Sequence, residues 1–213
     1  MPSAAETGDV QVRGARLPRD QRRAQLLDAA NEVFATRGYH AAAMDEIAAA
    51  AGISKPVLYQ HFDSKLDLYV ALLDRACDSL LGVVQVALAS TDRNADRVVA
   101  VIGAFYDFVT SAGGEFRFVF ESDLTGDGRV QDRLWQVNND VADSIAAVIA
   151  EDTRMPPEQA KLLAISLVGL AQVSARYWVS DRSASIGLEQ AKQLVSTLAW
   201  RGISGFPLAP REA

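Results

Sequence analysis

The side chains best suited to bind another molecule lie within one short stretch of this 213-residue chain, residues 38–68. A lysine ammonium can reach a guanine edge or a phosphate, and a phenol or an imidazole can bind phosphate oxygens. A proline has no donor but can contact a thymine methyl group. The candidates for contact with nucleic acid in this stretch are Ser54, Lys55, Pro56, Tyr59, His61 and Lys65. The alternative to a role in binding is a purely structural one: Tyr59 and His61 would then pack within the protein, and Lys65 would be an ordinary surface charge.

A cluster of arginines precedes this stretch. Five arginines fall between positions 13 and 23. Two of them, Arg13 and Arg16, lie in a segment without a helical pattern, and Arg19 lies just after it. Arginine suits a narrow, negatively charged minor groove, so these three are further candidates for contact with DNA. The solvated start of a helix would carry the same residues.

The elements that must position these side chains follow from the spacing of the apolar residues. A helix begins after Pro18 and ends near Gly38, and a second, short helix covers residues 44–50. Gly52 permits a sharp turn, after which Ser54 can cap a third helix over residues 55–61. Two short helices joined by a tight turn form a helix-turn-helix, although an ordinary corner between two helices gives the same pattern.

Helical spacing continues through the rest of the chain, and no stretch shows the alternation of a strand. The fold class is therefore all-α, with about nine helices. The later helices are expected from about residue 64 to residues 82–88 and at about 95–111, 115–123, 129–151, 157–180 and 187–204. We expect three parts: a flexible basic arm (1–17), a helix-turn-helix domain (18–65), and a domain for ligand binding and dimerisation (66–213).

The middle helices are rich in aromatic residues, which are more typical of plain core than of a ligand site. With few charges among them, they also suit a pocket for an elongated apolar ligand. The candidates for this ligand site are Phe105, Phe108, Phe116, Phe120 and Trp135.

The last two expected helices have matching apolar stripes with small residues between them, which favours close packing of helices from two subunits. The candidates for this dimer interface are Leu170, Tyr177, Leu194 and Leu198.

Four motifs occur in order over residues 44–68, and together they resemble the TetR family of bacterial transcription regulators. They are MDEIA (44–48), AGISK (51–55), VLYQHF (57–62) and SKLDL (64–68). The run FATRGY (34–39) before them also resembles that family. The resemblance implies a homodimer with an N-terminal DNA-binding domain, double-stranded operator DNA as a partner, and a variable C-terminal domain. Ala42 stands where the family usually has a threonine that caps the second helix and contacts a DNA phosphate. The resemblance therefore does not extend to this cap or to this phosphate contact.

Further segments resemble a narrower group, the actinobacterial TetR-type regulators of fatty-acid synthase genes. They are RGYHAA (37–42), KPVLYQHF (55–62), RFVFESD (117–123), ARYW (175–178) and AWRGIS (199–204). This resemblance implies control of fatty-acid biosynthesis genes and release of DNA by long-chain acyl-CoA. The alternative is a TetR-type repressor of an efflux or catabolic gene that responds to another hydrophobic molecule.

Composition excludes several other classes. Hydrophobic residues make up 49% of the chain and charged residues 23%, as in a globular protein with a real core. One cysteine and two histidines argue against a disulfide, a metal site or a cofactor built on them. No phosphate-binding loop, nucleophile elbow or metalloprotease motif occurs, so we expect no enzyme.

No long apolar run or signal peptide is evident, so we expect a cytoplasmic protein without membrane contact. The net charge of −6 argues against nucleic acid as a partner, but the charge is unevenly distributed. Residues 10–65 carry eight basic and six acidic side chains, against 13 and 19 from residue 66 onward. A helical module that dimerises and binds ligand without binding DNA remains the other interpretation.

Overall fold

The computed structural model describes residues 18–111, 118, 124, 126–179 and 185–202. These residues form eight helices and no strand, which confirms the all-α prediction. The helices are α1 (Arg19–Ala41), α2 (Met44–Ala50), α3 (Lys55–Tyr59), α4 (Lys65–Ala89), α5 (Asn94–Thr110), α7 (Gly128–Thr153), α8 (Pro157–Val179) and α9 (Leu188–Arg201). The further helix expected at 115–123 falls almost wholly outside the described residues.

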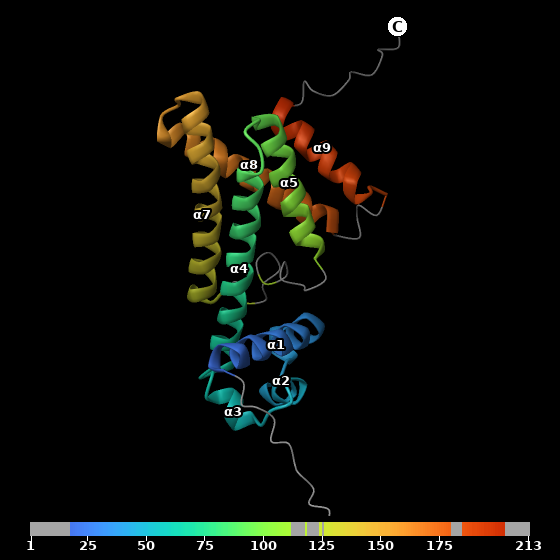
Figure 1. Ribbon diagram of the computed structural model, residues 1–213. Helices are drawn as coiled ribbons and strands as arrows, with labels where there is room; N and C mark the ends of the chain where they lie inside the picture. Colours follow the sequence, from blue (N-terminus) through green and yellow to red (C-terminus); the bar gives the residue numbers. More distant parts are fainter. Residues whose placement is uncertain (1–17, 112–117, 119–123, 125, 180–184, 203–213) are drawn as a thin grey trace, which may run out of the picture.

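Helices α1 to α3 form a small lobe at one end of the molecule (Figure 1). Gly38 has a φ of 71° and kinks α1, which continues for three residues past the expected end. Gly52 has a φ of 67° and makes the turn between α2 and α3, as the sequence predicts. Helix α3 ends at Tyr59, two residues earlier than expected.

A compact apolar core fixes the angle between the helices of this lobe. Leu26 of α1, Ile47 of α2 and Leu58 of α3 are each fully buried, and Phe62 closes the core after α3. Because each helix contributes one side to this core, the outer face of α3 remains free to meet another molecule.

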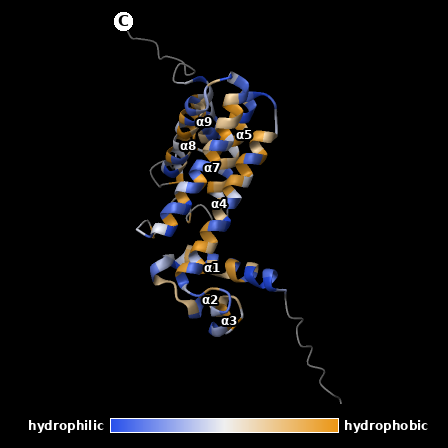
Figure 2. Cartoon of the chain, turned by 90° about the vertical axis from the view of Figure 1, so that its left-hand side faces the viewer, coloured by the Kyte–Doolittle hydropathy of each residue, from blue (hydrophilic) through white to orange (hydrophobic). Residues whose placement is uncertain are grey.

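Helix α4 runs from this lobe into the larger one and packs against α5 and α7 (Figures 1 and 2). Ser64 caps its N-terminus, because the Ser64 hydroxyl oxygen accepts a hydrogen bond of 3.0 Å from the Asp67 amide. The helix reaches Ala89, beyond the region where the sequence pattern fades. Helix α8 packs on α7, and α9 packs on α5 and α8.

Aromatic side chains join the two lobes. Phe34 and Tyr39 of α1 pack against Tyr69 of α4, with ring centroids 5.5 Å and 5.2 Å from that of Tyr69. Phe118 adds a fourth ring, with its centroid 5.3 Å from that of Tyr69. An ion pair of 2.6 Å between Arg75 of α4 and Asp28 of α1 lies beside them. The small lobe is therefore held on α4 by packing as well as by charge.

Helix α8 carries several large apolar side chains that this chain leaves uncovered. Leu162 is 67% exposed, Val173 68% and Tyr177 56%. Among the described residues, α8 is the one helix long and apolar enough to span a membrane, but length and composition alone are weak evidence. Its apolar residues form a stripe along one side, since Ala160, Ala164, Ala171 and Ala175 on the other side are buried. Such a stripe is typical of a helix that packs against another protein surface.

The turn glycine gives a direct test of this fold. Gly52→Ala should lower the free energy of unfolding by about 1 kcal/mol, because a side chain at positive φ is strained even where space is open. Gly82→Ala is the matched control: it lies within α4 with equally open surroundings and should raise that free energy by about 0.5–1 kcal/mol. Urea unfolding measures both; equal effects of the two substitutions would contradict the assigned backbone conformations.

Candidate DNA-binding surface and effector pocket

The outer face of α3 displays most of the candidate contact residues. Ser54, Lys55, Pro56 and Tyr59 are exposed, with Tyr59 at 41%, and His61 is half-buried. Leu58 points the other way, into the core. The structure thus brings these five candidates together on one side of the small lobe, at the end of the molecule.

Two details of this face differ from the sequence-based expectation. Ser54 stands at the N-cap position of α3, but its hydroxyl makes no capping hydrogen bond. Its carbonyl oxygen instead accepts from the amides of Val57 and Leu58. The hydroxyl therefore remains available for a phosphate oxygen. Gln60, which the sequence analysis overlooked, is also exposed at the end of α3. A glutamine amide can pair with adenine in the major groove.

Lys55 makes an ion pair within this surface. Its ammonium nitrogen lies 2.9 Å from a carboxylate oxygen of Asp45, which belongs to the first turn of α2. The hydrogen bond that the Lys55 ammonium donates to Asp45 raises the pKa of Lys55, so the lysine remains charged. The sequence analysis did not name Asp45 as a candidate. An acidic residue at the start of α2, close to the start of α3, is the feature that could have pointed to it.

Lys65 makes hydrogen bonds within the protein that the expectation of a phosphate contact did not include. Its ammonium donates to the carbonyl oxygens of Tyr39, Ala42 and His40 at 2.8, 2.9 and 3.3 Å. It also lies 4.5 Å from the centroid of the Tyr39 ring. An ammonium has three donors, and three acceptors at the end of α1 already use them. The sequence could not show this, because these acceptors are backbone atoms more than 20 positions away.

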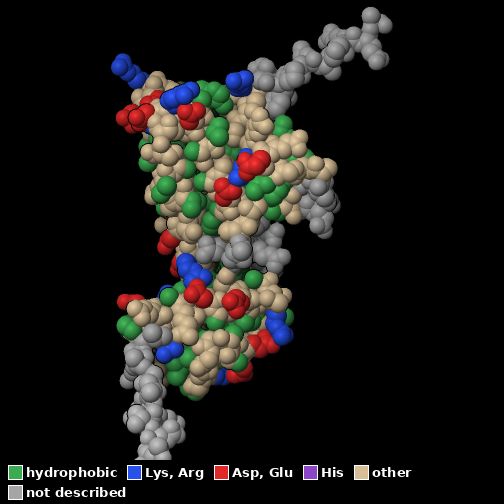
Figure 3. Space-filling model, turned by 45° about the vertical axis from the view of Figure 1, so that its right-hand side comes forward, with side chains coloured by type: hydrophobic (Ala, Val, Ile, Leu, Met, Phe, Trp, Pro, Cys, Tyr) green, Lys and Arg blue, Asp and Glu red, His purple; other side chains and the backbone are tan. Residues whose placement is uncertain are grey.

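The remaining basic residues of the lobe surround this face. Arg19 is exposed at the start of α1, whereas Arg13 and Arg16 lie outside the described residues. Arg37 pairs with Glu46 at 3.1 Å, and the Arg23 guanidinium lies 5.0 Å from the centroid of the Phe62 ring. On the face of the lobe that Figure 3 shows, basic and acidic side chains are interspersed and form no broad basic patch.

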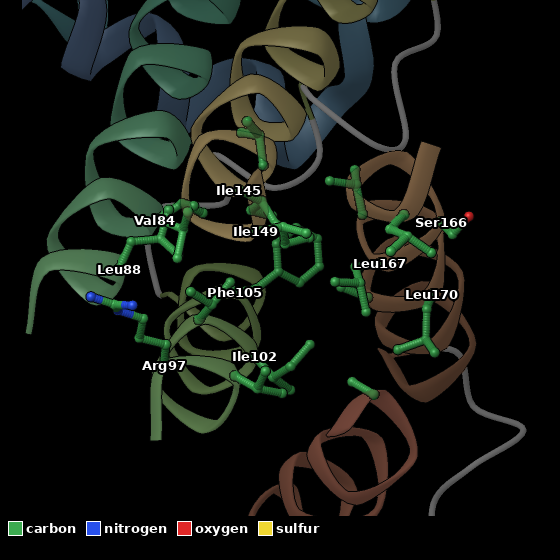
Figure 4. A pocket seen from close by; sticks show the side chains of 18 of the residues that line it. Val84, Leu88, Arg97, Ile102, Phe105, Ile145, Ile149, Ser166, Leu167 and Leu170 are labelled. Atoms are coloured by element: carbon green, nitrogen blue, oxygen red, sulfur yellow. The ribbon is translucent and has the colours of Figure 1, made fainter. Parts of the chain in front are cut away.

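The larger lobe contains a mainly apolar cavity of about 570 Å³ between α4, α5, α7, α8 and α9 (Figure 4). Its walls are aliphatic: Val84 and Leu88 come from α4, Ile145 and Ile149 from α7, and Leu167 from α8. This volume falls in the range of small-molecule sites. The cavity is therefore the candidate effector pocket.

Polar groups gather where α5 begins and α7 ends. The Arg97 guanidinium donates to Asp152 at 3.0 Å, to the Asn94 side chain at 2.8 Å and to the Thr91 carbonyl at 2.8 Å. Arg97, Asn94 and Asp152 all contribute to the pocket wall. The pocket thus has one charged edge, and the rest of its lining is mainly apolar, with Ser166 and Gln172 of α8 as polar exceptions.

The aromatic candidates fall in different places. Phe105 lines the pocket, whereas Phe108 is buried and does not contribute to its wall. Trp135 is 70% exposed on α7 and does not line the cavity either, which corrects the expectation for that residue. Phe116 and Phe120 lie outside the described residues. The abundance of aromatic residues correctly pointed to the larger lobe as the place of the pocket. The pocket walls, however, consist mostly of valine, isoleucine and leucine side chains at helical spacing.

The candidate dimer residues lie on α8 and α9. Tyr177, Leu194 and Leu198 are exposed, at 56%, 41% and 39%. Leu170 is half-buried and lines the pocket, as Leu198 does. The apolar stripe of α8 and the exposed leucines of α9 give a surface suited to a second copy of the chain, and it adjoins the pocket wall.

The described residues offer no alternative chemical centre. No group of three or more potential metal-ligating side chains occurs among them. Burial raises the pKa of the Cys77 thiol to about 12, so this thiol is not a nucleophile at neutral pH.

Ion pairs connect α7 with the half of α4 that lies next to the small lobe. Arg133 of α7 binds Asp74 and Asp78 of α4 at 2.8 and 2.6 Å. Arg129 of α7 binds Asp67 in the first turn of α4 at 2.8 Å. Hydrogen bonds from Ser64 and Arg129 lower the pKa of Asp67, so this link is charged at neutral pH. A shift of α7 relative to α4 would therefore reach the base of the helix-turn-helix.

The two lysines provide a matched test of the surface. Lys65→Met should lower the free energy of unfolding by roughly 1–3 kcal/mol, since three carbonyl groups lose a charged donor. It should leave the salt dependence of DNA binding unchanged. Lys55→Met should leave stability nearly unchanged, lower affinity for the operator and relax the preference at one base position, because Lys55 lies at the start of α3, where it can reach a base edge. Thermal unfolding and fluorescence anisotropy at several salt concentrations measure these effects; a shallower slope for Lys65→Met would place its ammonium on DNA.

Comparisons with known proteins agree with this geometry. The family model "Bacterial regulatory proteins, tetR family" matches residues 26–72. The HTH-type transcriptional activator FasR of Mycolicibacterium smegmatis is 43% identical over 196 residues, which cover 92% of this chain and 89% of FasR. The crystal structure of a TetR-like transcriptional regulator from Rhodococcus sp. RHA1 superposes with a TM-score of 0.65 at 29% identity, over 90% of this chain and 100% of that one.

A more distant structure shares the fold. FadR of Bacillus subtilis, solved in complex with stearoyl-CoA, superposes with a TM-score of 0.69 over 84% of this chain and 98% of that chain. Its sequence identity is 17%, so the likeness concerns the arrangement of the helices.

Proposed function

The chain belongs to the TetR family of bacterial transcription regulators, and from that premise we propose a homodimer that binds operator DNA through α3 and releases it on binding a long-chain acyl-CoA. Its relatives are regulators rather than enzymes. The genes under its control are those of fatty-acid biosynthesis. A regulator of chromosomal genes acts in the cytoplasm.

The observation that carries the DNA-binding role is the exposed face of α3. Its length of five residues suits insertion into a major groove, with Lys55 and Gln60 toward base edges and Tyr59 and His61 toward phosphates. Arg19 at the start of α1 lies at the edge of the same lobe, and Arg13 and Arg16 precede it toward the adjacent minor groove. The domain boundaries follow: the arm over 1–17, the DNA-binding domain over 18–65, and the sensing domain over 66–213.

The dimer explains the uncovered apolar side chains of α8 and α9. Two recognition helices must reach successive major grooves about 34–36 Å apart, and a two-fold symmetric pair meets that spacing on a palindrome. Burial of Leu162, Val173 and Tyr177 against a second copy removes large apolar side chains from water. The small residues Gly169 and Ser166 beside them allow the helices to approach closely.

A single charge should break this interface. Leu194→Asp should give monomers at micromolar concentration, because the carboxylate would be buried without a partner. Specific DNA binding should fall by at least 100-fold while helix content stays unchanged. Val99→Asp is the matched control, since Val99 is 57% exposed and belongs to α5 rather than to α8 or α9, and this variant should leave the dimer intact. Sedimentation velocity decides the matter: a monomeric unmodified protein at that concentration would refute the dimer.

The pocket supports the acyl-CoA assignment through its shape and chemistry. Its aliphatic walls match a hydrocarbon tail, and Phe105 lies among them (Figure 4). The charged edge at Arg97 suits the polar end of such a ligand, where an anionic group can compete with Asp152 for the guanidinium. The segments that resemble regulators of fatty-acid synthase genes, and the fold shared with a protein solved with stearoyl-CoA, support the same ligand class.

Chain length provides the test of the ligand. Burial contributes about 0.8 kcal/mol per methylene, so each two-carbon extension of the acyl chain should lower the concentration needed to release DNA roughly tenfold until the pocket is full. Gel-shift titration of the operator complex measures this, with free CoA and the free fatty acid of equal length as controls. Equal release by free CoA, or a flat response to length, would contradict the proposal.

A pocket-filling variant separates sensing from DNA binding. Ile149→Trp places a bulky ring in the cavity wall and should abolish the response while operator affinity stays within about threefold of the unmodified protein. Val86→Trp is the matched control, because Val86 is 72% exposed on α4 and does not contribute to the pocket wall. This control should respond normally; loss of response in both variants would show that the effect is not specific to the pocket.

A further inference from the structure

We propose that Asp45 determines the specificity of the DNA-binding surface by holding the Lys55 ammonium in one position and by repelling phosphates that approach out of register. The proposal rests on the DNA-binding function above. It concerns a carboxylate on a surface whose role is to meet a polyanion.

The geometry places Asp45 at the junction of two helix starts. Asp45 is the second residue of α2, and Lys55 is the first residue of α3. Their charged atoms are 2.9 Å apart, and the side chains are 68% and 47% exposed. A carboxylate in the first turn of α2 favours the N-terminus of that helix, but an ion pair this exposed adds little to stability. Stability therefore does not account for the pairing of Asp45 with Lys55.

The neighbouring acidic residue shows the contrast. Glu46 accepts a hydrogen bond of 3.2 Å from the Ala43 amide at the start of α2 and also pairs with Arg37. Glu46 thus has a capping role within the fold. The contact that Asp45 makes is with Lys55, on the same lobe surface that displays α3.

Holding Lys55 changes what this lysine can do. An ammonium has three donors, of which Asp45 uses one, so two remain for a base edge. The flexible stem of a free lysine must lose rotamer freedom when its end is fixed on a base. Because Asp45 fixes the Lys55 side chain before DNA binds, a hydrogen bond to a correctly placed base costs less rotamer freedom. A phosphate that approaches from another direction does not benefit in this way.

The charge of Asp45 acts in the same direction. Non-specific binding depends almost entirely on attraction between cations and phosphates. A carboxylate beside Lys55 cancels part of that attraction wherever no base hydrogen bonds compensate for it. Asp45 should therefore weaken non-specific binding more than specific binding.

The test is Asp45→Asn in the full-length chain. Fluorescence anisotropy gives its affinity for the operator, for operators changed at one base pair each, and for a duplex of unrelated sequence. We expect non-specific affinity to rise roughly three- to tenfold and the salt slope on unrelated DNA to steepen by about 0.9, because the freed Lys55 neutralises one more phosphate. The preference at one base position should relax, so the ratio of specific to non-specific affinity should fall.

Three variants separate positioning from bulk charge. Asp63→Asn removes the same charge from an exposed position between α3 and α4 and should leave the specificity ratio unchanged. Asp45→Glu keeps the charge and should keep non-specific binding low. In a Lys55→Ala background, Asp45→Asn should cause no further loss of base preference, since the lysine it positions is absent.

The outcomes are distinct. Equal changes in the specificity ratio for Asp45→Asn and Asp63→Asn would overturn the proposal and leave the DNA-binding function intact, and so would an unchanged ratio for Asp45→Asn. Failure of the unmodified protein to bind any duplex would instead refute the proposed function itself. Thermal unfolding checks that Asp45→Asn folds; if it does not, Asp45→Ser, which also removes the charge, is measured on the same duplexes.

Discussion

The ammonium of Lys65 makes the contact on which the arrangement of the two lobes depends. Helix α1 ends in carbonyl groups that have no partner within the helix, and the ammonium at the start of α4 satisfies three of them. The same ammonium lies over the Tyr39 ring, which packs on Tyr69 of α4. The end of one helix and the start of another are thereby fixed together, and the orientation of α3 follows from that junction.

This junction also explains how an event in the pocket can reach α3. Helix α4 contributes Val84 to the pocket wall and Lys65 to the small lobe, so the two sites share one rigid element. Arg129 and Arg133 attach α7, another pocket wall, to the DNA-proximal half of α4. A ligand that binds one arrangement of α4 and α7 better than the other shifts the population of that arrangement. Coupling of this kind is reciprocal: in the proposed function, DNA weakens ligand binding by the same factor by which the ligand weakens DNA binding.

Much of the fold could be predicted from the sequence because its determinants are local. Gly52 and the apolar spacing of each helix act over a few residues, and the structure agrees with them. The pocket wall could not be predicted in the same way, since it depends on which faces of five helices meet. Aromatic density suggested Trp135, which is exposed, whereas Ile145 and Ile149 form the wall. The role of Lys65 was missed because its partners are backbone carbonyl groups.

The opposition between an acidic chain and a DNA-binding role is resolved by where the charges lie. The net charge of −6 belongs to the whole chain, whereas binding depends on charges within about one Debye length of the phosphates, roughly 8 Å at physiological salt. Within the small lobe, carboxylates pair with Arg37 and Lys55, so part of its positive charge is neutralised locally. With the proposed role of Asp45, such a surface attracts unrelated DNA weakly and depends on a matching sequence for affinity. A regulator must find one operator among a great excess of other sites, and that requirement favours restrained charge over a strongly basic surface.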